Sequence, residues 1–84
     1  EKKLKVELLF NGSTGFHLSE TPMSKDQKYK EEINNRIRIT GTVADTEQLR
    51  WWILGFGENV EVLKPKSLRD EFVRRSNLLN KIYK

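Results

Sequence analysis

The stretch from Val43 to Leu63, VADTEQLRWWILGFGENVEVL, constrains the fold more than any other part of the chain. It predicts a short helix between two strands. Asp45 is the expected N-cap, and Gln48, three residues later, can return a hydrogen bond and complete a capping box. The apolar stripe expected on this helix follows helical spacing and consists of Leu49, Trp52, Ile53 and Phe56.

The end of this helix and the strand after it are also marked. Gly57 can adopt the left-handed conformation that ends a helix. The residues from Val60 to Leu63 then predict a strand, which Pro65 stops because proline cannot donate to the hydrogen-bond ladder of a sheet.

Residues 3–10 predict a half-buried strand, because apolar and polar side chains alternate along them. The tripeptide Asn11-Gly12-Ser13 predicts a turn, and residues 14–20 predict a short helix that ends before Pro22. The side chains expected on the buried face of the strand are Leu4, Val6, Leu8 and Phe10, and those on the other face are Lys3, Lys5, Glu7 and Leu9.

Residues 27–33 and 36–43 predict a hairpin around Asn34 and Asn35. A two-residue loop would place Ile33 opposite a charged side chain. A three-residue loop, residues 34–36, gathers apolar side chains and pairs opposite charges, so we expect this register. The pairs that it predicts are Ile33 with Ile37 and Glu32 with Arg38. It also turns Tyr29 towards the core.

A final helix is expected to begin at Ser67, its predicted N-cap, with Asp70 and Glu71 in the first turn. Its main apolar line consists of Leu68, Phe72, Leu79 and Tyr83. Cations gather towards its end, where the helix dipole favours them, and these are Arg74, Arg75, Lys81 and Lys84.

The first six elements follow the order strand, helix, strand, strand, helix, strand. This order predicts a ferredoxin-like α+β fold, β-α-β-β-α-β, with an antiparallel sheet and an added C-terminal helix. Right-handed crossovers would put the first two helices on one face of the sheet. The 84 residues are expected to form a single domain, 1–84, because a chain of this length supports only one small core.

The composition narrows the function. The chain has no cysteine and a single histidine, which excludes thiolate and histidine-cluster metal sites. Its acidic residues lie at expected helix starts or among other charges, without the closed pocket that acid–base catalysis needs. We therefore expect no enzymatic activity, no catalytic residues, no cofactor and no metal. No apolar run approaches the ~20 residues of a membrane helix, so no membrane association is expected.

Positive charge suggests one candidate surface. The net charge is +4, a mild excess that suits contact with polyanions and equally suits a solvated surface. Lys28, Lys30 and Arg38 are expected to share the outer face of the hairpin, with Arg36 and Arg50 behind them. These five residues are the candidate contacts for nucleic acid or another anion. The expected strand at 36–40 has no aromatic residue, which argues against a stand-alone RNA-recognition module.

The two tryptophans have different expected positions. Trp52 lies on the apolar stripe and is predicted to be core. Trp51 lies ~100° further round the helix, at the edge of the buried face. Because partly exposed tryptophans often anchor contacts between proteins, Trp51 is the candidate interface residue, with core periphery as the other interpretation.

The same central stretch carries a family resemblance. The pattern D-x-E-x-L-x-x-W-(I/L)-L-x-F-G-x-x-V-E-V-L-x-P-x-x-L-R resembles the WCX module, which is the C-terminal extension of WYL-domain transcriptional regulators. Residues 21–27, TPMSKDQ, are similar to a weaker pattern of that family, T-P-L-H-x-S-Q, and depart from it at Ser24, where histidine is common. The residues that match the first pattern are Asp45, Glu47, Leu49, Trp52, Ile53, Leu54, Phe56, Gly57, Val60, Glu61, Val62, Leu63, Pro65, Leu68 and Arg69.

The resemblance implies a bacterial, cytoplasmic regulator in which a helix-turn-helix DNA-binding domain and a WYL domain precede this module. The chain begins at Glu1 and enters a strand almost at once, as expected of a C-terminal piece of a longer protein. The implied partners are the WYL domain of the same or a partner chain, a second copy in a full-length homodimer, DNA through the N-terminal domain, and a nucleotide or single-stranded nucleic acid as ligand. The module would contribute dimer contacts and help to couple ligand sensing with DNA binding.

Two other functions remain open. The same element order is found in ACT domains, which bind small molecules beside glycine-containing turns after the first strand. Asn11-Gly12-Ser13 and Gly15 lie in that place here. The module can also be a structural spacer that binds nothing alone, and analogy of fold does not rank these functions.

Overall fold

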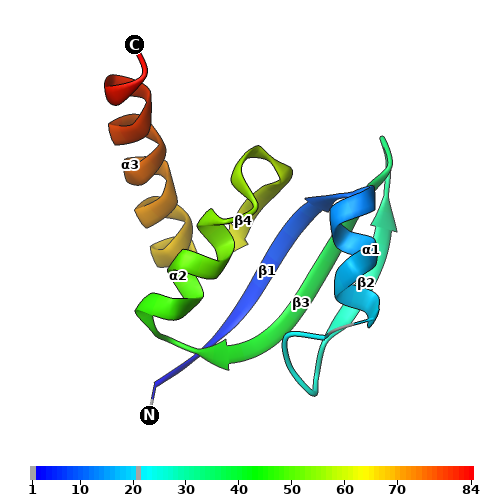
Figure 1. The fold of residues 1–84 in the computed structure, drawn as a ribbon. Coiled ribbons are helices and arrows are strands. Elements are labelled where there is room, and N and C mark those ends of the chain that lie inside the picture. The colour runs from blue at the N-terminus through cyan, green and yellow to red at the C-terminus, as the bar shows by residue number, and fades with distance from the viewer. Residues whose placement is uncertain (1, 21) are drawn as a thin grey trace.

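The computed structural model describes residues 2–20 and 22–84, without the side chains of Phe16, His17, Ser19 and Glu20. A four-stranded antiparallel sheet forms its centre (Figure 1). The strands are β1 (Lys3–Asn11), β2 (Lys28–Glu32), β3 (Arg36–Ala44) and β4 (Val60–Lys64), in the order β2-β3-β1-β4. The helices are α1 (Gly12–Glu20), α2 (Glu47–Leu54) and α3 (Lys66–Ile82), with a 3₁₀ turn, η1 (Gly57–Asn59), before β4. The predicted α+β class and the C-terminal helix are confirmed.

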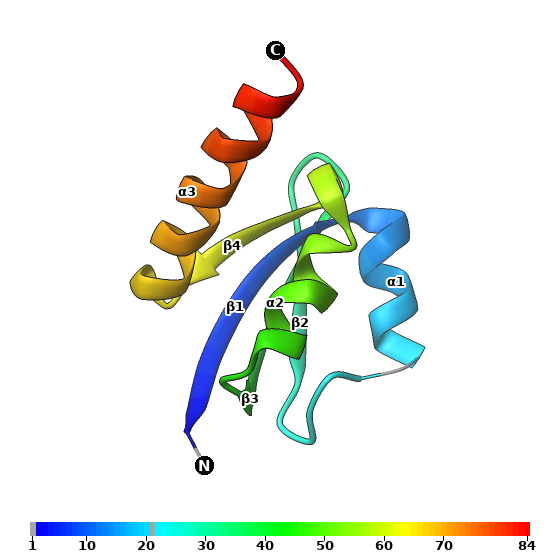
Figure 2. The same ribbon diagram turned by 60° about the vertical axis from the view of Figure 1, so that its left-hand side comes forward.

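The core lies on one face of this sheet. The predicted alternation of β1 is confirmed, because Val6, Leu8 and Phe10 are all fully buried. The helices α1 and α2 both place apolar side chains against this row, so both lie on the same face, as predicted (Figure 2). The remaining core residues are Leu18, Ile39, Leu49, Ile53, Val62 and Leu68.

The expected turn at Asn11-Gly12-Ser13 is wrong, because β1 continues to Asn11 and α1 begins directly at Gly12. The Gly12 N–H donates a hydrogen bond of 2.8 Å to the Asn35 carbonyl in the hairpin turn. A Cβ atom added at Gly12 would lie 2.7 Å from that carbonyl oxygen. The glycine therefore allows the start of α1 to approach another part of the backbone.

The predicted hairpin register is also wrong. The loop consists of residues 33–35, and Glu32 lies opposite Arg36. Asn34 and Asn35 both adopt left-handed conformations, with φ of 62° and 57°, which asparagine tolerates better than other non-glycine residues. Ile33 is left 81% exposed in this loop. Because the error is an even number of residues, each β2 side chain still lies on its expected face of the sheet.

The cap of α2 differs from the expectation at Asp45. Thr46 is the N-cap, and its Oγ1 atom accepts a hydrogen bond of 3.1 Å from the Leu49 N–H. Gly57 has the predicted positive φ, 57°, but α2 has already ended at Leu54. The left-handed residue therefore shapes the turn into β4.

The last helix begins at Lys66, and its N-cap, Pro65, lies two residues before the predicted cap at Ser67. Its first half packs on the core through Leu68 and Phe72. Its second half rises away from the sheet, with the chain end far from the other elements (Figures 1 and 2). None of the helices in the described part of the chain is long and apolar enough to span a bilayer.

Two glycines near the end of α2 give a matched test of backbone strain. Gly57→Ala should lower the free energy of unfolding by about 1 kcal/mol, because an L residue at φ 57° is strained. No atom lies within 4 Å of the added Cβ, so a steric clash does not contribute. Gly55 has φ −62° and ψ −21°, so Gly55→Ala should leave the stability unchanged or slightly higher. Urea denaturation followed by tryptophan fluorescence measures the stability of both variants. Equal losses of stability would contradict the backbone strain expected at position 57.

Candidate functional site

The sheet face opposite the helices carries charged side chains in register. One row across the strands consists of Lys30, Arg38, Leu9 and Glu61. The next row places Lys28 opposite Thr40, and Thr40 opposite Glu7. The prediction that Lys28, Lys30 and Arg38 share this outer face is confirmed, and Arg36 lies on it as well, opposite Glu32.

The two arginines on this face are held by carboxylates. Arg38 Nη1 lies 3.0 Å from Glu7 Oε2, and its Nε lies 3.3 Å from Glu32 Oε2. Arg36 Nη2 lies 3.2 Å from Glu61 Oε1, and Arg69 contacts the other oxygen of Glu61 at 2.9 Å. Arg69 and then Arg36 lower the pKa of Glu61. The positive charges of Arg36 and Arg38 are therefore already paired with carboxylates of the same face.

The lysines differ from the arginines in this respect. Lys28 and Lys30 are exposed and have no carboxylate within ion-pair distance among the described residues. Lys3 and Lys5, opposite Ala44 and Thr42, lie on the same face and are exposed too. We call these four residues the lysine face. Lys3 and Lys5 are not among the predicted contacts, although the alternation of residues 3–10 places them on this face.

The carboxylate of Asp26 lies at one edge of this surface. Asp26 accepts hydrogen bonds from the Thr42 N–H at 2.9 Å, the Thr42 hydroxyl at 2.7 Å and the Ser24 hydroxyl at 2.7 Å. The two bonds from Thr42, backbone first, hold the pKa of Asp26 well below its usual range. Gln27 braces the same loop, accepting from the Met23 N–H at 2.8 Å and donating to the Leu18 carbonyl at 3.0 Å. Residues 22–27, which carry most of the weaker sequence pattern, thus form a loop that Asp26 joins to β3. Thr21, the first residue of that pattern, lies outside the described residues.

Arg50 is placed differently from the other candidate cations. Its side chain is only 11% exposed and forms a two-pronged pair with Glu71 of α3, at 3.0 and 3.1 Å. It also donates to Asp45 and, at 3.0 Å, to the Thr46 carbonyl. These bonds raise the pKa of Arg50, and Arg50 lowers the pKa of Glu71. The structure therefore gives Arg50 the role of joining α2 to α3, and separates it from the lysine face.

The tryptophans lie close to their expected positions, except that Trp52, predicted to be core, is only partly buried against the core. Trp52 packs edge-to-face on Phe56, with ring centroids 5.0 Å apart, and Phe56 packs likewise on Phe10 at 5.1 Å. Trp51 is 60% exposed, which confirms its position at the edge of the buried face. Its role in an interface stays a prediction.

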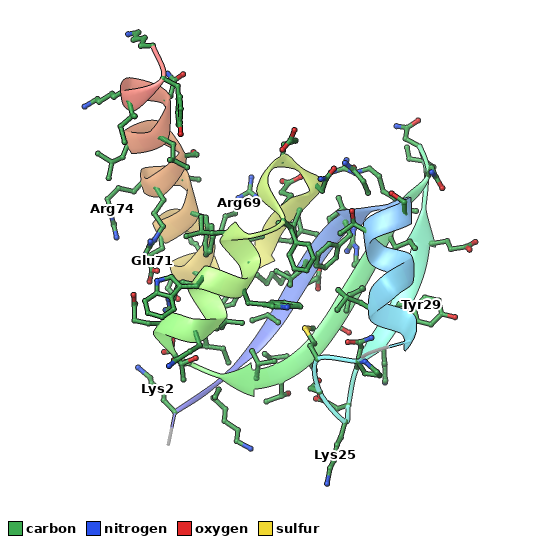
Figure 3. All side chains as sticks on the ribbon, in the orientation of Figure 1. Lys2, Lys25, Tyr29, Arg69, Glu71 and Arg74 are labelled. Atoms are coloured by element: carbon green, nitrogen blue, oxygen red, sulfur yellow. The ribbon has the colours of Figure 1, made fainter. Side chains whose placement is uncertain are left out.

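Tyr29 does not reach the core. It lies opposite Ile39 on the core side of the sheet but is 61% exposed. Figure 3 shows it at the outer edge of β2, beyond α1. The face was predicted correctly, but the edge strand extends past the helix that would cover this residue.

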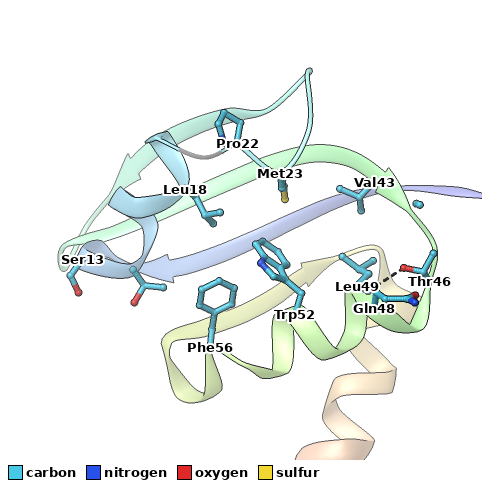
Figure 4. A pocket seen from close by; sticks show the side chains of 12 residues that line it. Ser13, Leu18, Pro22, Met23, Val43, Thr46, Gln48, Leu49, Trp52 and Phe56 are labelled. Carbon is cyan, nitrogen blue, oxygen red and sulfur yellow. Dashed lines mark hydrogen bonds between the residues drawn. The ribbon is translucent and has the colours of Figure 1, made fainter.

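A groove of about 640 Å³ separates α1 from α2 on the helix-covered face (Figure 4). Trp52, Phe56 and Leu49 form one wall, and Leu18 and Met23 lie across from them. The described side chains that line it carry no formal charge. Among the side chains that the structure describes, which leave out those of His17 and Glu20, no cluster of three His, Cys, Asp or Glu is placed to hold a metal ion.

Comparison with known proteins gives one family. The family model of the WCX domain matches residues 2–77, from β1 through most of α3. No curated protein matches the chain in sequence.

The pair between Arg50 and Glu71 predicts a large and pH-dependent contribution to stability. Arg50→Ala should lower the free energy of unfolding by about 2 kcal/mol at neutral pH, because two half-buried carboxylates lose charge-assisted hydrogen bonds. Since the pKa of Glu71 is lowered in the folded state, this contribution is present above the carboxylate's unfolded pKa and is lost as the pH falls. The difference between parent and variant should therefore shrink below about pH 4.

Urea denaturation at neutral and acidic pH measures this difference. Arg50→Lys should recover only part of the loss, because an ammonium group cannot make the paired contact with Glu71. The control is Lys66→Ala, which removes the exposed pair with Asp70 and should cost less than about 1 kcal/mol. A similar loss in Lys66→Ala, or a difference that does not depend on pH, would contradict the assignment.

Proposed function

Because this chain belongs to the WCX domain family, we propose that it is the regulatory and assembly module of a bacterial WYL-type transcriptional regulator, without enzymatic activity of its own. The observation that carries the proposal is the family match over residues 2–77. In this role the module lies beside a WYL domain of the same or a partner chain in a cytoplasmic homodimer. The helix-turn-helix domain of the same regulator binds DNA.

The mechanism that we propose is a shift between arrangements of domains. A ligand that binds one arrangement better than another changes their populations, and with them the affinity for the operator. This module contributes through the surfaces that its fold leaves accessible. Trp51, which is 60% exposed, is the residue that we propose to lie in an assembly contact.

We also interpret the fold as ferredoxin-like. The support is the strand order β2-β3-β1-β4, in which every neighbouring pair is antiparallel. One helix connects β1 to β2, which lie on either side of β3. A second connects β3 to β4, which lie on either side of β1. This arrangement is built from two interlocked β-α-β units, with α3 added after them.

For ligand contact we propose the lysine face in place of the three arginines among the predicted contacts. Arg36, Arg38 and Arg50 each have at least one carboxylate partner at 3.3 Å or closer. An ammonium group without such a partner attracts phosphate at a lower cost, because no existing ion pair has to be broken. A nucleotide or single-stranded nucleic acid is the ligand class that suits this surface.

The small-molecule alternative resembling ACT domains is supported less well. Its natural site is the groove between α1 and α2, whose described lining is uncharged. A free amino acid or nucleotide carries a carboxylate or phosphate, and the described lining offers it only neutral donors, such as the hydroxyls of Ser13 and Thr14, and no cation. The predicted glycine turn after β1 is also absent from the described chain, since α1 begins at Gly12.

The lysine face can be tested with a short fluorescent single-stranded oligonucleotide and anisotropy. We expect binding that weakens steeply with salt. Lys28→Gln with Lys30→Gln should reduce the affinity and lower the slope of log K against log salt by about 1.4, because two phosphate contacts are lost. Arg38 is left intact, because its removal would leave Glu7 and Glu32 without their partner.

The matched control for this test is Lys81→Gln with Lys84→Gln, which removes the same charge from exposed positions at the end of the chain, away from the lysine face. It should change the slope much less. No binding by the parent, or equal effects of the two double variants, would contradict the proposed anion contact and leave the assembly role standing.

The assembly role can be tested at Trp51 in the complete regulator. Trp51→Ala should raise the dissociation constant of the dimer at least about tenfold in sedimentation experiments, because a buried tryptophan anchor contributes about 2 kcal/mol or more. The stability of the present chain should change by less than about 0.5 kcal/mol, since the side chain is largely exposed in it. Tyr29→Ala, at 61% exposure, is the matched control and should leave the dimer intact. Unchanged self-association in Trp51→Ala would overturn this assignment.

A further inference from the structure

The second half of α3 has an apolar side that no other described part of the chain covers. Leu68 is 1% exposed and Phe72 packs on the core, so the first turns are buried. Beyond them the helix leaves the domain (Figures 1 and 2). The large apolar side chains exposed there are Val73 at 49%, Leu78 at 54%, Leu79 at 46%, Ile82 at 72% and Tyr83 at 83%.

Three of these side chains continue the buried face of the helix. At 3.6 residues per turn, Leu79, Ile82 and Tyr83 fall within about 60° of Leu68 around the axis. The stripe also borders an apolar groove of about 450 Å³ that Leu54, Val60 and Phe72 help to line. The exposed stripe is therefore an extension of the core-facing surface past the edge of the domain. Single exposed apolar residues are ordinary, but a continuous stripe of this kind marks a contact surface.

The charges along α3 are divided between its halves. Asp70 and Glu71 lie in the first half, where Lys66 pairs with Asp70 at 2.8 Å and Arg50 pairs with Glu71 at 3.0 Å. From residue 72 to the end, the chain contains no Asp or Glu. The cations of this segment are Arg74, Arg75, Lys81 and Lys84. Figure 3 shows Arg74 pointing away from the domain.

This charge pattern indicates what kind of partner could cover the apolar stripe. A second copy that packed its own stripe against this one would bring two purely basic segments together, which is unfavourable. An anionic membrane would attract the helix end as well, but Val73 and Leu79 line the groove beside α2, a hollow that a flat bilayer surface does not fill. A protein groove with an apolar floor and carboxylates on its rim matches both the stripe and the cations.

We infer that residues 73–84, the second half of α3 with the two residues that follow it, form a docking segment that inserts Leu79, Ile82 and Tyr83 into an apolar groove of another domain, with carboxylates on the groove rim paired to its cations. The inference rests on the proposed assembly role and names the chemistry of the partner surface. The partner domain belongs to the same regulator.

Hydrogen exchange measures docking directly. Amides of residues 73–84 should exchange at least about tenfold more slowly in the complete regulator than in the present chain, because docking removes local opening of the helix end. Two double variants should abolish this ratio. Leu79→Ser with Ile82→Ser removes the apolar contact, and Lys81→Glu with Lys84→Glu reverses the charge. Each variant is compared in both polypeptides, so that its effect on the helix itself cancels.

The control variant is Lys2→Glu with Lys25→Glu, which makes the same charge change at the end of the domain away from the tip of α3 (Figure 3). It should keep the ratio, and salt at about 0.5 M should lower the ratio in the parent. Equal exchange in the two polypeptides would overturn the inference. A ratio that responds to the serine variant but not to charge reversal would overturn the acidic rim.

Two further measurements decide between occupants. If the present chain forms a dimer in sedimentation that Leu79→Ser abolishes, the occupant is a second copy and the inference is wrong. It is equally wrong if vesicles of phosphatidylserine and phosphatidylcholine protect residues 73–84. DNA binding by the complete regulator is measured on the same preparations. If docking is absent but the complete regulator binds DNA, only this inference is wrong. If the complete regulator binds no DNA, the proposed function is wrong.

Discussion

The apolar row of β1 is the constraint on which the rest of the domain depends. Val6, Leu8 and Phe10 are fully buried, and β1 pairs with β3 on one side and β4 on the other. Both helices of the main body contact this row, and α3 adds Leu68 to it. Because side chains alternate along a strand, the same nine residues also present Lys5, Glu7 and Leu9 to the opposite face. One strand therefore fixes both where the core lies and which charges are available outside it.

The sequence predicts this strand and the order of elements because both depend on local periodicity. It fails where distant groups decide. The hairpin register depends on left-handed Asn34 and Asn35, and on α1, whose Gly15 lies close to Ile37 of β3. Asp45 is the best local candidate for an N-cap, but Arg50, itself held by Glu71 in another helix, binds it instead, and Thr46 takes the cap. The apolar spacing of α3 is the same in both halves, so periodicity could not show that only the first half packs.

Arginine and lysine are used differently in this domain. Arg36, Arg38, Arg50 and Arg69 all join separate elements through carboxylates, as a planar group with several fixed donors allows. The lysines of β1 and β2 remain in solvent. A prediction from positive charge treats the two residue types alike, so it cannot separate arginines that carboxylates already hold from lysines that remain in solvent. The difference is visible only when partners from distant strands and helices are known.

The two proposed contact surfaces lie on different parts of the fold, and this separation has a physical consequence. The lysine face belongs to the central sheet, whereas the proposed docking stripe lies on the half of α3 that extends beyond it. The paired contact between Arg50 and Glu71 is the polar link that sets the angle of α3 relative to α2. If a partner docks on the tip of α3, as we propose, its effect on the domain would pass through the contacts of Arg50 and Leu68. Coupling between that partner and a ligand on the sheet would require this junction to adopt two arrangements, which makes it the place to look for them in the complete regulator.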